Sequence, residues 1–121
     1  MKNILVVDDD ADLRTVVKMR LEIEGYNVNT ASDGKECLKA VAEGKPDLIL
    51  LDMTMPVMDG YTALNKLKEQ PESADIPVII FSIKEKMKME GLFMGDNVAC
   101  YIEKPFETEE LIGKVKAILG E

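Results

Sequence analysis

The 121-residue sequence lacks histidine entirely and contains only two cysteines, Cys37 and Cys100. The spacing of the two cysteines is not that of a metal-binding pair, and no other cysteine or histidine is present to complete a zinc site. We therefore expect both cysteines to be small, buried hydrophobic residues of a protein in a reducing compartment.

Basic residues are also scarce. The sequence has 15 of them against 23 acidic residues, which gives a formal net charge of −8. Nucleic acids and anionic membrane surfaces both attract basic faces, so this composition argues against either as a direct partner. The apolar run at residues 4–7 is too short for a signal peptide or a membrane span. We expect a cytoplasmic protein.

Repeats, low-complexity segments and linkers are absent as well. A chain of 121 residues is long enough to bury one core, and its content of 46% apolar and 31% charged residues is ordinary for a globular protein. We expect a single domain over residues 1–121.

Short apolar runs alternate with amphipathic stretches along the chain. The continuous runs at 4–7, 48–51 and 78–81 are rich in branched residues, which is typical of strands buried on both faces of a parallel sheet. Residues 26–31 and 101–102 predict shorter or more exposed strands. The sequence thus predicts five strands.

The intervals between these strands carry apolar residues at helical spacing. Clear stripes lie at 13–21, 37–42, 63–67 and 111–119. Between residues 84 and 97 the spacing is only partly helical, and Gly91 and Gly95 each cost about 1 kcal/mol relative to alanine, so we expect a short or mobile fourth helix there. The alternation predicts a doubly wound α/β fold with five helices on a five-stranded parallel sheet and right-handed crossovers.

Polar residues follow the predicted strands at the edge where sites form in open parallel sheets. The first strand ends in Asp8, Asp9 and Asp10, the third in Asp52, the fourth in Ser82, and the fifth in Lys104, which Pro105 follows. Carboxylates, a hydroxyl and an ammonium group should therefore meet at one edge.

Adjacent carboxylates need a counter-charge, because two unit charges 4 Å apart repel by about 4 kcal/mol at the effective dielectric of a protein surface. Mg²⁺ supplies one, and it can also bridge to a phosphoryl oxygen. A carboxylate such as Asp52 can attack phosphorus and form an aspartyl phosphate. Ser82 and Lys104 would then bind the new oxygens.

Four segments, VVDDD, LILLDMTMPVMDG, VIIFS and YIEKPF, together resemble the motif set of the response-regulator receiver domains of two-component signalling. They occur in the family's order and cover nearly the whole chain. The resemblance implies a flavodoxin-like sheet of order 2-1-3-4-5. It also implies phosphoryl transfer from a sensor histidine kinase or phosphotransfer protein onto Asp52. Such a protein is a signalling phosphoacceptor that catalyses only its own phosphorylation and dephosphorylation.

The same resemblance assigns roles around Asp52. It implies a Mg²⁺ site in which Asp9 is a direct ligand together with Asp52, Asp8 helps through water, and Thr54 contributes its main-chain carbonyl. Lys104 would pair with the phosphoryl group, with Ser82 and Tyr101 as the switch residues. The resemblance further implies a cis Lys104–Pro105 bond and an output face for a downstream protein, formed by the fourth helix, fifth strand and fifth helix.

The sequence departs from the family pattern in two places. Bulky Ile83 follows the switch hydroxyl, where the family usually has a small residue, so we expect slow phosphorylation by small donors and slow hydrolysis. The segment GDNVACY replaces the family's usual pair of small residues, which leaves the form of the fourth helix open.

Simpler interpretations exist for each site residue. Asp10 is most simply the N-cap of the first helix. The others also have ordinary alternatives: a solvated turn for Asp8 and Asp9, a turn residue at Asp52, a plain strand-end hydroxyl at Ser82, a surface charge at Lys104, and a core or edge tyrosine at Tyr101.

Three other function classes compete with the phosphoacceptor. An aspartate-nucleophile phosphatase would also use acids after a strand, but it needs a substrate-enclosing cap for which 121 residues leave no room. A degenerate receiver would bind partners without phosphorylation. A flavin carrier is disfavoured because an acidic first loop repels the cofactor's phosphate.

Overall fold

The computed structural model describes residues 2–52, 60–83 and 98–120. The strands are β1 (Asn3–Val7), β2 (Asn27–Ala31), β3 (Leu48–Asp52), β4 (Val78–Ile83) and β5 (Val98–Lys104). The helices are α1 (Ala11–Ile23), α2 (Gly34–Glu43), α3 (Gly60–Glu69) and α5 (Thr108–Leu119). The fourth helix expected at 84–97 lies outside the described residues.

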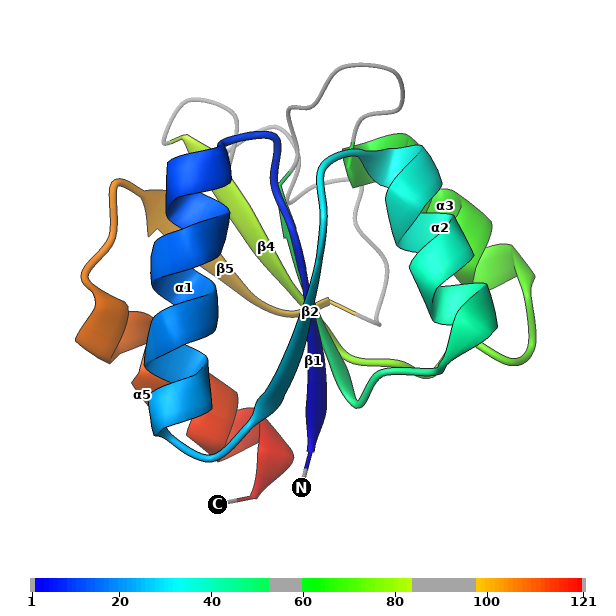
Figure 1. Ribbon diagram of the computed structural model, residues 1–121. Helices are drawn as coiled ribbons and strands as arrows, with labels where there is room; N and C mark the ends of the chain where they lie inside the picture. The colour runs from blue at the N-terminus through cyan, green and yellow to red at the C-terminus, as the bar shows by residue number, and fades with distance from the viewer. Residues whose placement is uncertain (1, 53–59, 84–97, 121) are drawn as a thin grey trace.

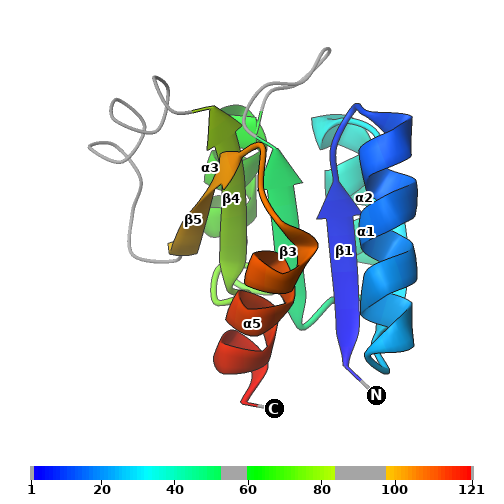
Figure 2. The same cartoon turned by 90° about the vertical axis from the view of Figure 1, so that its left-hand side faces the viewer.

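The five strands form one parallel sheet in the order β2-β1-β3-β4-β5. Helices α1 and α5 cover one face of this sheet, and α2 and α3 cover the other (Figure 1). A view turned by a quarter shows β1, β3, β4 and β5 with their carboxyl ends at the same edge (Figure 2). The predicted doubly wound α/β fold and its strand order are confirmed.

The core consists of two apolar layers, one on each face of the sheet. Successive side chains of a strand point to opposite faces, so Leu48 and Leu50 join the layer under α1 and α5, while Ile49 and Leu51 join the layer under α2 and α3. All four are fully buried, and each such side chain contributes about 1.5–3 kcal/mol. The central strands therefore form a rigid platform for the residues that follow them.

Two strands extend beyond the apolar runs that indicated them. β4 extends to Ile83 and includes Ser82, and β5 spans Val98–Lys104 rather than residues 101–102. The apolar pattern missed most of β5 because this strand alternates half-buried and exposed residues, with only Ile102 fully buried. Backbone pairing with β4 continues to the end of β5, where Ile83 lies opposite Lys104.

The predicted helix ends and cysteine environments are largely confirmed. Asp10 caps α1, because its carboxylate accepts hydrogen bonds from the amides of Asp12 and Leu13. Gly25 follows α1 with a φ of 97°, a conformation that favours glycine. Cys37 is buried as predicted, which raises the pKa of its thiol to about 12. The prediction of a buried Cys100 is wrong: this residue lies in β5, an edge strand, and is only half-buried.

Among the described residues, none of the helices is long and apolar enough to cross a membrane.

Two glycines of equal steric freedom should respond oppositely to alanine. Gly113 is exposed within α5, and a β-carbon there would meet no atom within 4 Å. We expect Gly113→Ala to raise the free energy of unfolding by about 0.5–1 kcal/mol, since alanine removes the entropy cost of a helical glycine. Urea denaturation measures this change.

Gly25→Ala is the matched control, because its β-carbon would also meet nothing within 4 Å while the positive φ of Gly25 remains. We expect this variant to lose about 1 kcal/mol or more. A loss of stability in Gly113→Ala would contradict the assignment of an unstrained helical glycine.

Candidate functional site

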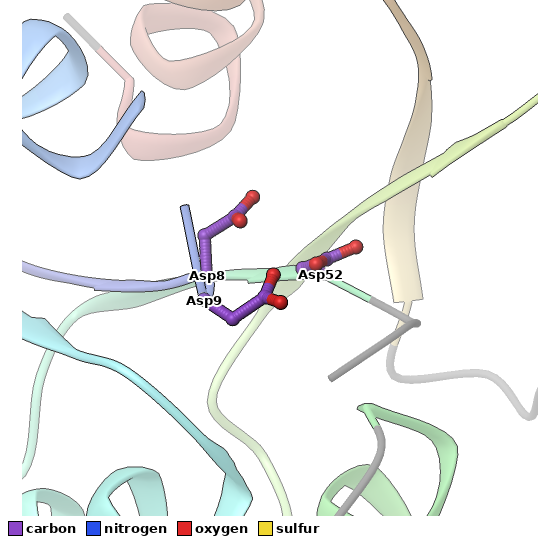
Figure 3. Close-up of side chains that lie close together, drawn as sticks. All are labelled: Asp8, Asp9 and Asp52. Atoms are coloured by element: carbon purple, nitrogen blue, oxygen red, sulfur yellow. The ribbon is translucent and has the colours of Figure 1, made fainter. Parts of the chain in front are cut away.

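Three carboxylates meet at the carboxyl edge of the sheet. β1 and β3 pair with Val7 opposite Leu51, so the next residues, Asp8 and Asp52, lie side by side. Oxygens of Asp8, Asp9 and Asp52 all lie within 4.8 Å of one another. Figure 3 shows the carboxylate of Asp9 directed toward Asp52. The parallel register therefore brings Asp52 together with two acids that lie 43 and 44 residues before it in the sequence.

Asp8 and Asp9 differ sharply in environment. Asp8 is fully buried, and both of its carboxylate oxygens accept hydrogen bonds: Oδ1 from the amide of Asp10 at 2.9 Å and Oδ2 from Lys104 Nζ at 2.7 Å. Asp9 is exposed. The accessible oxygens of the pair are therefore those of Asp9.

Lys104 connects the two buried acids. Its Nζ lies 2.7 Å from Oδ2 of Asp8 and 3.4 Å from Oδ1 of Asp52, and its side chain is only 22% exposed. The interpretation of Lys104 as a surface charge is therefore wrong. The interpretation as a solvated turn also fails for Asp8, because this residue is buried. Asp52 is likewise only 5% exposed.

Opposing effects set the charge of Lys104. Burial by itself lowers the pKa of Lys104, but the hydrogen bond to Asp8 and the charges of Asp52 and Asp8 together raise it above the ordinary 10.5. A pKa raised in the folded state means that the stabilisation is complete below the ordinary pKa and is lost only as the pH rises through the higher value. Lys104 is therefore a fixed cation at neutral pH.

An aromatic pair lies beside Lys104. Phe81 of β4 stacks on Phe106 with ring centroids 4.9 Å apart, and Lys104 Nζ lies 6.0 Å from the centroid of Phe81. The bond between Lys104 and Pro105 is cis, as the resemblance implied. Sequence reasoning missed the aromatic stack, because nothing in the sequence pairs these two rings.

The donor set fits a hard divalent cation. Three carboxylates face one ammonium group, and oxygen is the ligand atom that Mg²⁺ prefers. Asp9 and Asp52 could bind such an ion directly, whereas both oxygens of Asp8 already accept hydrogen bonds, which favours contact through water.

The other predicted site residues are less completely placed. Ser82 lies in β4 opposite Glu103, but its side chain, like the whole of Thr54, falls outside the described part of the chain. Tyr101 is half-buried in β5 and packs against the apolar layer under α2 and α3. The position of Tyr101 agrees both with a switch aromatic and with an edge tyrosine.

One contact at this edge has no counterpart in the sequence reasoning. Arg14, in the second turn of α1, donates a hydrogen bond from Nη1 to the main-chain carbonyl oxygen of Asp8 at 2.6 Å. The sequence carries no signal for this contact, because a main-chain acceptor leaves no mark in the residue types.

Lys104→Met should expose the dependence of the buried acids on their cation. We expect the free energy of unfolding to fall by about 1–3 kcal/mol in the absence of divalent ions, because the buried carboxylate of Asp8 loses a charged partner. Saturating MgCl₂ should stabilise the variant more than the original protein, since the cluster has become more negative. Urea denaturation with EDTA and with MgCl₂ measures both effects.

Lys45→Met is the matched control. Lys45 Nζ contacts Asp75 at 3.3 Å, but both side chains are more than half exposed, so the change should stay below about 1 kcal/mol and should not depend on Mg²⁺. Equal losses in the two variants would contradict the role assigned to Lys104.

Comparisons with known proteins agree with this geometry. A family model described as the response regulator receiver domain matches residues 4–116. The alkaline phosphatase synthesis transcriptional regulatory protein PhoP of Bacillus subtilis is 42% identical over 118 residues, which cover 98% of this chain and 48% of that protein. The DNA-binding dual master transcriptional regulator RpaA of Synechocystis is 36% identical over 98% of this chain and 49% of its own. The chain thus spans about half the length of these relatives.

Solved structures match over nearly the whole chain. The receiver domain of a signal transduction histidine kinase from Syntrophus aciditrophicus superposes with a TM-score of 0.90 at 33% identity, covering 99% of this chain and 91% of that one. The chemotaxis protein CheY4 of Vibrio cholerae gives 0.87 at 30% identity and 98% coverage of both chains. With the sheet order and the acidic edge already established, these matches show that the chain belongs to the response-regulator receiver domain family of two-component signalling.

Proposed function

We propose that Asp52 accepts a phosphoryl group from the phosphohistidine of a sensor histidine kinase or a phosphotransfer protein. The observation that carries this proposal is the position of Asp52, which ends β3 inside the acidic cluster with Lys104 Nζ 3.4 Å from its Oδ1. The aspartate-nucleophile phosphatase and the flavin carrier are set aside, because the chain belongs to the receiver family.

The proposed transfer uses the carboxylate of Asp52 and the groups that surround it at this edge. A carboxylate oxygen of Asp52 attacks phosphorus, an O–P bond forms, the N–P bond of the phosphohistidine breaks, and the released imidazole keeps the electron pair. Lys104 stands where it can pair with the oxygens of the transferred group. The receiver catalyses this step and the later hydrolysis on itself alone.

Mg²⁺ fits the proposed reaction through the charge that it adds. Asp9 and Asp52 would bind it directly, Asp8 through water, and Thr54 through its main-chain carbonyl. When bound, the ion offsets the negative charge that gathers on the phosphoryl oxygens.

Phosphorylation of Asp52 would alter a surface that binds a downstream protein. The phosphoryl oxygens of an aspartyl phosphate would attract the ammonium group of Lys104, which already pairs with Asp8. This competition would shift the equilibrium between two conformations of this edge. Ser82 and Tyr101 are the proposed switch residues, and the proposed face comprises residues 84–97, β5 and α5.

We further propose that residues 1–121 act in the cytoplasm as one domain without binding nucleic acid or membrane, consistent with the net charge of −8.

Intact-protein mass spectrometry tests the phosphoacceptor assignment. Incubation with acetyl phosphate and Mg²⁺ should add one phosphoryl group to the original protein, none without Mg²⁺, and none to Asp52→Asn, because an amide oxygen is a far weaker nucleophile than a carboxylate. Asp10→Asn is the matched control, since Asp10 caps α1 and asparagine caps almost as well. Loss of phosphorylation in Asp10→Asn but not in Asp52→Asn would contradict the assignment.

Ile83→Ala tests the expected effect of a bulky residue beside Ser82. We expect the alanine variant to gain the phosphoryl group at least several-fold faster from acetyl phosphate and to lose it faster, because a smaller side chain opens access to Asp52. The same mass measurement followed over time gives both rates. If neither protein gains a phosphoryl group, the degenerate receiver replaces the phosphoacceptor; equal rates would show that Ile83 does not limit access.

A further inference from the structure

Arg14 lies near several acidic residues but contacts a main-chain oxygen. Its Nη1 donates to the main-chain oxygen of Asp8 at 2.6 Å, and among the described residues its guanidinium forms no ion pair within 4.0 Å. The side chain is half-buried in a helix that carries Asp10 as its cap and Asp12 in its first turn. The contact with Asp8 therefore orients backbone rather than neutralising one carboxylate.

The carbonyl that Arg14 holds belongs to the peptide unit between Asp8 and Asp9. A peptide unit is planar, so fixing its oxygen also restrains the nitrogen and the α-carbon of Asp9. The hydrogen-bonded amide of Asp10 restrains the other side of Asp9, and the two restraints together limit the direction in which the Asp9 side chain leaves the backbone. On the other sides, the Asp8 amide donates to the Ala31 carbonyl at 3.1 Å, and the Asp10 amide donates to Asp8 Oδ1. Arg14 thus completes the restraint of a turn whose middle residue, Asp9, is exposed.

The position of Asp9 depends on this restraint more than that of the other two acids. Asp8 is held by Lys104 and Asp10, and Asp52 lies within β3 in register with β1 and β4. Asp9 follows the end of β1 and belongs to neither β1 nor α1. Its carboxylate nevertheless lies within 4.8 Å of the other two.

We propose that Arg14 is a positioning residue for the divalent-cation site: through the carbonyl of Asp8 it sets the direction of Asp9 and so keeps the Asp9 carboxylate converged on Asp52. This inference rests on the proposed function, because it takes Asp9 and Asp52 as ligands of the Mg²⁺ ion. It adds a residue whose role is exerted entirely through another residue's backbone.

Charge and position predict opposite results when Arg14 is removed. If the guanidinium acted only as a nearby positive charge, its loss would make the cluster more negative and tighten Mg²⁺ binding. If it positions Asp9, its loss weakens binding, because one ligand must be ordered by the ion itself. Residues that orient metal ligands typically change metal affinity by about 10- to 100-fold.

The test is a calorimetric titration of the unphosphorylated chain with MgCl₂. We expect Arg14→Met to weaken Mg²⁺ binding about 10-fold, and Arg14→Lys, which keeps the charge and a donor, to recover part of the loss. Lys18→Met is the matched control, since Lys18 lies one turn further along α1 and is also a half-buried cation. The control should bind Mg²⁺ as tightly as the original protein or slightly more tightly.

A second measurement keeps the inference testable apart from metal affinity. In ¹H–¹⁵N spectra recorded without metal, the Asp9 amide resonance should shift in Arg14→Met and remain in place in Lys18→Met, while urea denaturation confirms that both variants are folded. Unchanged or tighter Mg²⁺ binding by Arg14→Met would overturn the positioning role and leave the proposed function intact. Failure of the original protein to bind Mg²⁺ would overturn both.

Discussion

The contact between Lys104 and Asp8 is the interaction on which the arrangement of this edge depends. Asp8 and Asp52 follow the apolar residues of two central strands and are almost fully buried, and buried charges are costly unless they are paired. Their cation comes from a position 96 residues further along the chain from Asp8. β1, β3 and β5 must therefore end at the same level. The register of the whole sheet thus determines whether the buried carboxylates meet their cation.

Burial and exposure are divided between neighbouring residues at this edge. Asp8, Asp52 and Lys104 are held by strand pairing and by their mutual contacts, and Lys104 Nζ also lies 6.0 Å from the centroid of the Phe81 ring. Asp9 instead sits in an exposed turn whose direction is set by hydrogen bonds. A site organised in this way pairs its buried charges within the protein and leaves the carboxylate of Asp9 accessible.

The convergence of the site was predictable because parallel strands place their carboxyl ends together. Strand-end positions alone predicted that Asp8, Asp9, Asp52 and Lys104 would meet, and the structure confirms it. Three parts were not predictable from residue patterns, and one of them is the Phe81–Phe106 stack. Most of β5 lacks a continuous apolar run, because an edge strand buries few residues, and Arg14 binds a main-chain carbonyl, which every residue possesses.

The sequence by itself determined the alternation of strands and helices, the sheet order once its motifs were compared with the receiver family, and the residues at the carboxyl edge. These follow from local periodicity and from side-chain chemistry, which are properties of short segments. Only the tertiary structure decided that Asp8 is buried and already hydrogen-bonded while its neighbour Asp9 is exposed, and that Lys104 spans two acids rather than one. Burial and partner choice are set by elements distant in the chain, so two adjacent aspartates with the same chemistry acquire different environments.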